Sequence, residues 1–304
     1  MNRYARQTCL PGVGAEGQAR IEAARVLVVG AGGLGASLLP LLAGAGIGYL
    51  RLFDPDVVEE SNLHRQTLFR VSDIGRPKAR VAAGALAALN PACRVSAEVS
   101  RLDPAIARGE IPQADLVVDA ADNFAVSYAL SDLCLAQGKP LISASALGRR
   151  GYVGGFCGGA PSLRALFPDL PASAQTCATG GVMGPAVATL GALQAQMVLG
   201  VVLGQQPSPL GRAITLDLES WHVSGFRFDH APEPQSALPA VIAPAEIGPK
   251  DLVVDLRRDA TVPRTLPAGQ RVVLVCSTGL RAWRAAKALI ASGHCEVAIV
   301  GDGA

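Results

Sequence analysis

A glycine-rich turn follows a short apolar run near the start of the chain. Gly30, Gly32, Gly33 and Gly35 belong to the string GAGGLG, which satisfies the pattern G-x-G-x-x-G directly after the run RVLVV at 25–29. Gly30 permits a tight turn, Gly32 lets the backbone approach a phosphate, and Gly35 lets a helix and a strand pack closely. The pattern therefore predicts a site for nucleotide phosphates at a helix N-terminus, where the helix dipole favours anions.

Polar side chains further along indicate which nucleotide the turn would take. Asp54 ends the next apolar run, nineteen residues after Gly35, where a carboxylate can accept hydrogen bonds from ribose hydroxyls. The cations Arg65 and Lys78 are suited to clamp a triphosphate attacked at its α-phosphorus, whereas the diester pyrophosphate of a nicotinamide dinucleotide needs few such cations. The alternative is that both cations are solvated surface residues. The string around them favours the clamp.

These residues are separated by short apolar runs that alternate with longer helical patterns. We expect strands at 25–29, 49–53, 95–99, 116–119, 141–145 and 152–157, and helices at 34–45, 77–89 and 125–136. Such alternation predicts an α/β fold, a Rossmann-like doubly wound and mostly parallel sheet with helices on both faces. Two further strands, at 213–218 and 222–228, would add an antiparallel part.

A proline-rich segment separates this region from a smaller α/β unit. Residues 231–249 contain five prolines and no apolar periodicity, which predicts a linker between domains at 1–230 and 250–304. In the smaller unit we expect strands at 252–255, 271–275 and 297–300 and a helix at 281–291. About 55 residues is marginal for an independent core.

Composition excludes several classes of protein. The chain has 304 residues, of which 50% are hydrophobic and 17% charged, so intrinsic disorder is excluded as its main character. A formal net charge of +2 is too small to indicate a nucleic-acid or anionic-membrane surface. We therefore expect no nucleic-acid partner and no membrane association.

The seven cysteines never form a C-x-x-C pair, so neither a disulfide framework nor a zinc knuckle is indicated. Free thiols suit a reducing compartment, and residues 1–14 lack the apolar core of a signal peptide. These observations favour a cytoplasmic location.

Residues 170–211 contain no charged side chain and no histidine, which is a pattern also seen in membrane spans. The densest part, 182–203, is rich in Ala and Gly and includes Pro185, Gln194 and Gln196. This composition favours a helix buried inside a domain or at a subunit interface.

Seven strings, in this order, resemble the ThiF/MoeB/HesA family of ubiquitin-activating-type adenylyltransferases. They are RYARQ at 3–7, GAGGLG at 30–35, SNLHRQ at 61–66, GRPK at 75–78, NP at 90–91, DAADN at 119–123 and TCATGGVMGP at 176–185. The resemblance covers roughly residues 3–228. It implies an enzyme that uses ATP to adenylate the C-terminal Gly-Gly carboxylate of a ubiquitin-like sulfur-carrier protein and releases pyrophosphate. Such enzymes act in sulfur transfer for thiamin or molybdenum cofactor biosynthesis.

The resemblance also implies roles for single residues. A carboxylate that attacks an α-phosphate brings two anions together, so the site must neutralise both and hold them in line. Asp122 would hold Mg²⁺, although it could instead cap the helix at 125–136. Arg6 would reach the triphosphate of a partner subunit in a homodimer. The residues implied around the ATP, besides the glycine turn, are Asp54, Asn62, Arg65, Gln66 and Lys78.

Two cysteines are candidates for sulfur chemistry. By the resemblance, Cys177 could form a thioester or acyl-disulfide with the activated carrier, or it could be an inert core residue. Cys276 lies in the string CSTGLR, which with DLR at 255–257 is similar to a rhodanese domain. The backbone amides after Cys276 would form a cradle for a thiolate or persulfide. A persulfide-donating cysteine desulfurase is then a further expected partner.

Several features depart from these families. Only about 20 residues separate Asp255 from the Cys276 loop, and Ala282 stands where Ser or Thr is common, so the unit could instead be a remnant that only packs on the main domain. Relatives often hold zinc with two C-x-x-C pairs, and because this chain has none we predict no zinc site.

The sequence leaves two alternative functions. A dinucleotide-dependent oxidoreductase using NAD or FAD would need a Tyr-x-x-x-Lys pair or an acid/base His near the glycine turn, and the chain offers neither. A non-catalytic scaffold that binds a carrier through the C-terminal unit is the other alternative. Intact Arg65, Lys78 and Asp122 argue against lost activity.

Overall fold

The structure is a computed structural model. It describes residues 3–169, 180–235, 238–258, 262 and 269–301.

An eight-stranded sheet forms the centre of the larger part of the chain, in the strand order β3-β2-β1-β4-β5-β6-β7-β8. The first five strands in this order pair in parallel, and β6, β7 and β8 extend the sheet in antiparallel fashion. This arrangement confirms the predicted Rossmann-like sheet with an added antiparallel part. The strands are β1 (Arg25–Val29), β2 (Tyr49–Phe53), β3 (Arg94–Glu98), β4 (Leu116–Asp119), β5 (Pro140–Leu147), β6 (Arg150–Cys157), β7 (Arg212–Asp217) and β8 (His222–Arg227).

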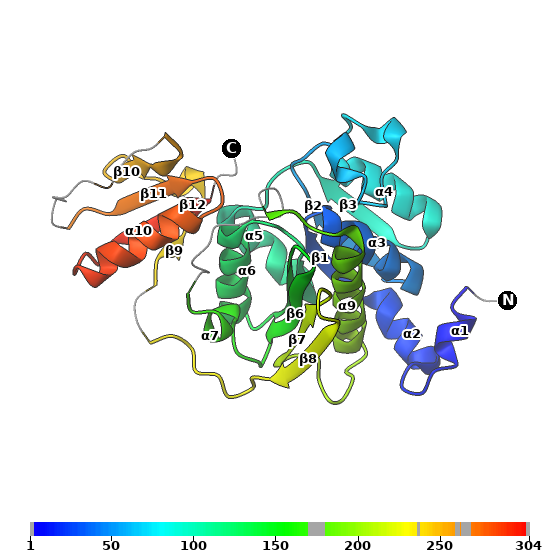
Figure 1. Cartoon of the computed structure of the whole chain (residues 1–304). Helices are drawn as coiled ribbons and strands as arrows, with labels where there is room; N and C mark the ends of the chain where they lie inside the picture. Colours follow the sequence, from blue (N-terminus) through cyan, green and yellow to red (C-terminus); the bar gives the residue numbers. More distant parts are fainter. Residues whose placement is uncertain (1–2, 170–179, 236–237, 259–261, 263–268, 302–304) are drawn as a thin grey trace.

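Helices cover both faces of this sheet (Figure 1). On one face the core contains residues of α3 (Gly33–Ala45), α4 (Lys78–Leu89) and α9 (Gly184–Val202). On the other face it contains residues of α5 (Pro104–Glu110), α6 (Phe124–Ala136) and α7 (Leu163–Leu166). Two separate cores, one on each side of the sheet, are typical of a doubly wound fold.

The uncharged helix expected from composition is α9. It is long and apolar enough to cross a membrane, and half of that window is buried inside the molecule. Gly191 brings its backbone against α3, because a Cβ there would lie 2.6 Å from the carbonyl oxygen of Leu34. The helix therefore packs as a core element beside α3, β5 and β6.

Two short helices precede β1 and were not expected from the sequence pattern. They are α1 (Ala5–Thr8) and α2 (Gly14–Ala23). Figure 1 shows both beyond α3 and α9, on the side of the large sheet away from the C-terminal unit. Tyr4, just before α1, is anchored by a hydrogen bond from Asn90 Nδ2 to its hydroxyl at 2.9 Å.

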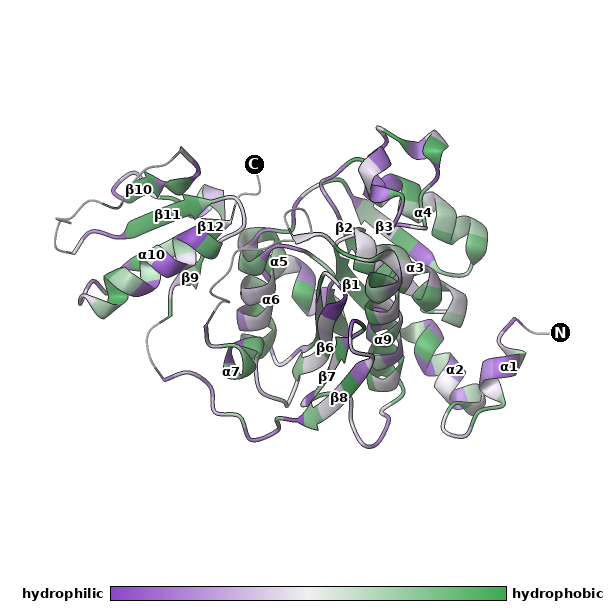
Figure 2. Cartoon of the chain, in the orientation of Figure 1, coloured by the Kyte–Doolittle hydropathy of each residue, from purple (hydrophilic) through white to green (hydrophobic). Residues whose placement is uncertain are grey.

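The C-terminal unit contains a second, four-stranded parallel sheet in the order β10-β11-β12-β9. Its elements are β9 (Ala240–Val241), β10 (Leu252–Asp255), β11 (Val272–Cys276), α10 (Leu280–Ala291) and β12 (Val297–Gly301). Hydrophobic residues dominate β1 and β11, which are inner strands of the two sheets (Figure 2).

Part of the segment predicted as a linker belongs to this second sheet. Ala240 and Val241 of β9 pair with Ala298 and Ile299 of β12. The pairing involves only two residues, too few for a strand pattern to be visible among the prolines. The division into 1–230, 231–249 and 250–304 otherwise stays a prediction.

Candidate nucleotide-binding site

The glycine turn connects β1 to α3 with the backbone that the motif requires. Gly30 has φ +103°, and a Cβ there would lie 2.6 Å from the carbonyl oxygen of Ala120. At Gly35 a Cβ would collide with the Gly30 carbonyl oxygen. The turn is therefore tight, and α3 begins at Gly33. Unpaired amides at that helix N-terminus are suited to anions.

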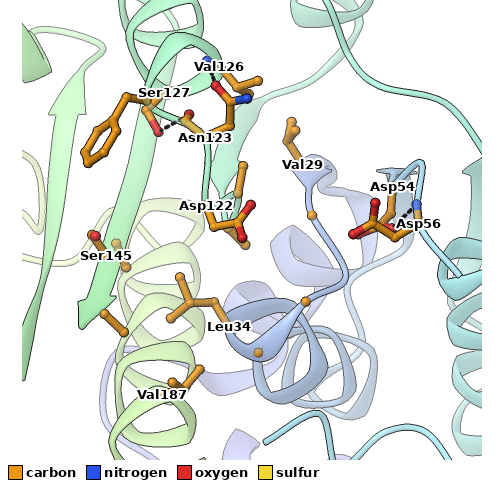
Figure 3. A pocket seen from close by; sticks show the side chains of 18 of the residues that line it. Val29, Leu34, Asp54, Asp56, Asp122, Asn123, Val126, Ser127, Ser145 and Val187 are labelled. Carbon is orange, nitrogen blue, oxygen red and sulfur yellow. Dashed lines mark hydrogen bonds between the residues drawn. The ribbon is translucent and has the colours of Figure 1, made fainter. Parts of the chain in front are cut away.

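A cavity of about 970 Å³ opens in front of this turn, at the carboxyl ends of the parallel strands. Figure 3 shows Asp122 and Asp54 on either side of it, with Leu34 of α3 below Asp122. The structure brings together nine residues predicted for the nucleotide and its metal, namely Gly30, Gly32, Gly33, Asp54, Asn62, Arg65, Gln66, Lys78 and Asp122.

Asp54 fixes the glycine turn to the end of β2. Its side chain is 4% exposed, and its oxygens accept hydrogen bonds from the backbone N–H of Ala31 at 2.7 Å and of Asp56 at 2.9 Å (Figure 3). Burial raises the pKa of this carboxyl. Each carboxylate oxygen accepts more than one hydrogen bond, so capacity remains for a ligand hydroxyl.

Lys78 is the first residue of α4 and is only 5% exposed, so a solvated surface position for it is wrong. Its Nζ lies 3.0 Å from Oδ2 of Asp56, and its backbone N–H donates to the Asp56 carbonyl oxygen. Asp56 lines the cavity but was not among the predicted site residues. The signal available was its place in the string DPD, where two carboxylates alternate at the end of a strand.

Arg65 lies against its own segment. Its guanidinium donates to the carbonyl oxygen of Ser61 at 2.9 Å and lies 2.9 Å from Nε2 of His64. A single side chain that reaches only local partners can turn toward a new anion without disturbing the fold. Arg101 is a further cation of the cavity lining that sequence reasoning missed.

Gln66 and Asn62 form the buried floor beside the turn. Gln66 is 2% exposed, and among the described residues its Oε1 has no hydrogen-bond donor. Its Nε2 lies 3.8 Å from the position that a Cβ on Gly32 would take. A buried polar atom without a partner is costly, and a ligand that donates a hydrogen bond would satisfy it. Asn62 is held by its Oδ1, which accepts from the N–H of Glu59.

The sequence left two roles open for Asp122, a Mg²⁺ ligand or the cap of α6, and the structure gives the cap to Asn123. Asn123 caps α6, because its Oδ1 accepts from the N–H of Ala125 at 2.9 Å and of Val126 at 3.3 Å. The alternative of a cap by Asp122 is therefore wrong. Asp122 is exposed, and its carboxylate points into the cavity (Figure 3).

Behind Asp122 lies a second carboxyl that sequence reasoning did not assign. Asp119, at the end of β4, is fully buried and accepts from the N–H of Ala121 at 3.2 Å and from Oγ of Ser143 at 2.8 Å. Burial raises its pKa to about 6. The bond to Ala121 holds the turn that carries Asp122.

Oxygen ligands in this cavity fit Mg²⁺ better than a metal that needs a protein cage. Among the described residues no group of three or more His, Cys, Asp or Glu side chains gathers. Mg²⁺ usually takes one or two carboxylates together with substrate phosphates and water. Asp122 at the cavity wall suits that pattern.

The far end of the cavity is apolar. Tyr128, Tyr152, Leu163 and Phe167 line it, and the rings of Tyr152 and Phe167 lie 4.8 Å apart. These residues, which we call the apolar arm, come from α6, β6, α7 and the residue after α7. The apolar arm offers a wall for an uncharged chain that approaches the glycine turn.

The remaining predicted site residues lie elsewhere. Arg6 is exposed on α1 and does not line the cavity of its own chain. Cys177 lies outside the described residues. Cys276 is buried at the end of β11, and its Sγ accepts from the backbone N–H of Ala282 at 3.4 Å.

Known proteins with similar sequences show which family this chain resembles. A family model described as the ThiF family matches residues 4–238. Adenylyltransferase and sulfurtransferase MOCS3 of Bos taurus is 44% identical over 220 residues, which are 71% of this chain and 48% of that protein. Probable adenylyltransferase/sulfurtransferase MoeZ of Mycobacterium tuberculosis is 39% identical over 222 residues, 71% of this chain and 57% of that protein. The chain thus spans about half the length of the curated relatives it matches.

Solved structures show the same fold. Escherichia coli MccB, in a crystal structure with AMPCPP and selenomethionine-labelled MccA, has a TM-score of 0.67 and 24% identity, and the match covers 76% of this chain and 73% of MccB.

Proposed function

Because the chain belongs to the ThiF family, we propose that it uses ATP to adenylate the C-terminal Gly-Gly carboxylate of a ubiquitin-like sulfur-carrier protein. The names of MOCS3 and MoeZ, which include adenylyltransferase, support this reaction. The observation that carries the proposal is the cavity itself. It gathers a helix N-terminus, the three cations Arg65, Lys78 and Arg101, and the inward-pointing carboxylate of Asp122 around one space.

The chemistry demands this combination. An oxygen of the carrier carboxylate bonds to the α-phosphorus of ATP, the bond to the bridging oxygen of the β-phosphate breaks, and pyrophosphate leaves with the electron pair. Both reactants are anions, so positive charge fixed in the cavity lowers the barrier by stabilising the charge that develops. Lys78 and Arg65, both in the cavity lining, would supply this charge.

Lys78 is prepared for a phosphate by its contact with Asp56. The Asp56 side chain is 61% exposed, so its pairing with Lys78 is weakened by water and is readily exchanged for a phosphate oxygen. Lys78 itself stays buried at the start of α4, and its ammonium group therefore has little freedom to lose on binding. Arg65 would exchange its contacts with Ser61 and His64 in the same way.

The uncharged parts of ATP also find partners. Asp54 is placed to accept from ribose hydroxyls, and the orphaned Oε1 of Gln66 would accept from a ligand N–H or O–H.

Asp122 would hold Mg²⁺, which when bound neutralises phosphate charge. The carrier tail would lie along the apolar arm of Tyr128, Tyr152 and Phe167, because two glycines carry no side chain and can approach the rings closely.

We further propose a homodimer in which Arg6 of one subunit completes the triphosphate site of the other. Exposed Arg6 on α1 lies away from the cavity of its own chain, so only another copy could bring the two together. Size-exclusion chromatography with mass measurement tests this assembly. An active monomer would contradict it.

ATP–pyrophosphate exchange tests the adenylation step. Exchange is expected only when a carrier ending in Gly-Gly is present, and removal of the last glycine of that carrier is expected to abolish it. Arg65→Ala is expected to reduce exchange by at least about a hundredfold while the protein stays folded, because one preorganised charge contact is lost. Undiminished exchange in the Arg65 variant, or none with any Gly-Gly carrier, would overturn the proposal.

A further inference from the structure

The C-terminal unit docks with its cysteine loop against the first turn of α6. Cys276 ends β11 and Gly301 ends β12, and these strands are parallel neighbours. The carboxyl ends of parallel strands are where α/β sheets bind ligands. In this chain the N-terminal turn of α6 lies at that edge, and Figure 1 shows the second sheet beside α6.

Main-chain atoms of the cysteine loop are bonded directly to this turn. Asn123 Nδ2 donates to the carbonyl oxygen of Ser277 at 3.2 Å, and the Ala125 N–H lies 3.4 Å from the carbonyl oxygen of Thr278. The same Asn123 side chain caps α6 through its oxygen. One amide group therefore orders the helix and holds the loop.

Two glycines allow the close approach. A Cβ on Gly279 would lie 2.7 Å from the Cβ of Ala125, and a Cβ on Gly301 would meet the same atom at a still shorter distance. Real Cβ atoms do not come this close. The fit therefore requires small residues on both sides of the contact.

The buried cation Arg164 makes a second contact between the main domain and the C-terminal unit. The guanidinium of Arg164 lies 4.7 Å from the ring centroid of Tyr128 and 4.8 Å from that of Trp283, and the two rings are themselves 5.3 Å apart. Asp132 accepts from Arg164 at 2.5 and 2.7 Å, and Lys287 of α10 pairs with Asp169. Trp283 of α10 is 2% exposed, so this contact is closely packed.

We propose that the first turn of α6 closes the mouth of the Cys276 loop, and that the thiol reacts only after the C-terminal unit leaves this turn. Cys276 is 1% exposed: it packs in the core of its own unit beside Leu274 and Ala282, and the first turn of α6 covers the loop that follows it. Asp122, which precedes the turn, lines the nucleotide cavity, and Asn123 both lines that cavity and bonds to the cysteine loop, so residues 122–125 contact both predicted chemical centres. Asn123 acts as the positioning residue between them. The docking does not depend on the proposed adenylation.

Two readouts on the full chain test this proposal. The chain has two tryptophans, so in a Trp221→Phe background the emission of Trp283 reports docking. Alkylation of Cys276 by iodoacetamide, followed by mass spectrometry, reports thiol access. Exposed Cys9 and Cys295 serve as internal standards in the same sample.

Gly301→Ala is expected to shift Trp283 emission to longer wavelength and to speed alkylation of Cys276 at least about tenfold, because its new Cβ collides with Ala125. The matched control is Gly248→Ala in the same unit, where the nearest atom would be 3.6 Å away. Rapid alkylation of Cys276 in the parent, or an emission shift without faster alkylation, would overturn the proposal. No emission shift in Gly301→Ala would overturn it as well.

Asn123→Asp separates the docking bond from the helix cap. Aspartate keeps the oxygen that accepts from Ala125 and Val126 but lacks the donor to Ser277. Faster alkylation of Cys276 with unchanged helix content by circular dichroism is expected. Alkylation at the parent rate would show that Asn123 does not position the loop. Failure of ATP to bind would contradict the proposed function but would leave both readouts interpretable.

Discussion

The ammonium group of Lys78 lies 3.0 Å from a carboxylate oxygen of Asp56, so the buried cation of the cavity already has an anionic partner. Lys78 is nearly inaccessible while Asp56 faces water. A buried charge needs a partner at all times, whereas a solvated carboxylate can give up its place at little cost. The pair thus keeps the cation in the cavity until a phosphate replaces the carboxylate.

Removal of this cation should abolish catalysis selectively. Lys78→Ala is expected to lower acyl-adenylate formation at least about a hundredfold, because a preorganised positive charge is lost. Arg80→Ala is the matched control, since Arg80 lies two positions later on α4 and is exposed. Formation of acyl-adenylate is followed with radiolabelled ATP. Equal losses in both variants would show that net charge, and not the cavity cation, matters.

Asp122 should affect activity without affecting stability. Asp122→Asn is expected to reduce ATP–pyrophosphate exchange by at least about a hundredfold and to raise the Mg²⁺ concentration required, because a carboxylate ligand is lost. Its melting temperature should stay close to that of the parent, since Asn123 supplies the helix cap.

The neighbouring position should show the reverse. Asn123→Ala is expected to cost about 1 kcal/mol of stability through the lost cap. Thermal unfolding of both variants provides the comparison. A large drop in melting temperature for Asp122→Asn would show that Asp122 has a structural part in the turn.

Asp119 should make stability depend on pH in the acid range. Burial raises its pKa from 3.8 to about 6, so the folded chain holds an extra proton between these values. The free energy of unfolding should therefore fall as the pH rises from about 4 to about 6, by up to about 3 kcal/mol for this group. In Asp119→Asn this contribution is absent. Urea unfolding at several pH values measures the difference, and parallel curves for the two proteins would exclude the assigned titration.

The glycine turn should tolerate no side chain at its first position. Gly30→Ala is expected to lower the free energy of unfolding by about 1 to 3 kcal/mol and to prevent ATP binding. The reason is that φ is +103° and the new Cβ would meet the Ala120 carbonyl oxygen. Gly84→Ala is the control, since this helical glycine in α4 has open space around it and alanine favours a helix. Denaturant unfolding and equilibrium dialysis with ATP measure the two effects. An unperturbed Gly30 variant would refute the strained turn.

Strands that alternate with helical patterns could be predicted from the sequence, because a sheet covered by helices buries their apolar residues. β1, β2 and β4 were predicted with the bounds that the structure shows, and their order placed the glycine turn at the correct edge. Short elements such as α1, α7 and β9 were missed. α1 and α7 are single helical turns and β9 pairs through two residues only, so tertiary contacts and not their own pattern stabilise them. The equally short β4 is recognisable because its run LVVD fits the alternation of strands and helices.

The site was predictable where a motif fixes the backbone and unpredictable where only packing decides. Gly30, Asp54 and Lys78 came together because they end or begin elements at one sheet edge. The burial of Asp119, the pairing of Asp56 with Lys78 and the stacking of Arg164 on Trp283 depend on segments far apart in sequence. A local pattern carries no signal for such contacts.

The length of chain between Glu233 and β9 sets how far the C-terminal unit can travel. Glu233 is bound to the main domain, where its carboxylate accepts from both the N–H and the hydroxyl of Ser162. Ala240 already pairs with β12. The seven-residue distance from Glu233 to Ala240 corresponds to at most about 25 Å of fully extended chain. A released unit can therefore pivot about its own chain, but the point where it joins that chain stays within about 25 Å of Glu233.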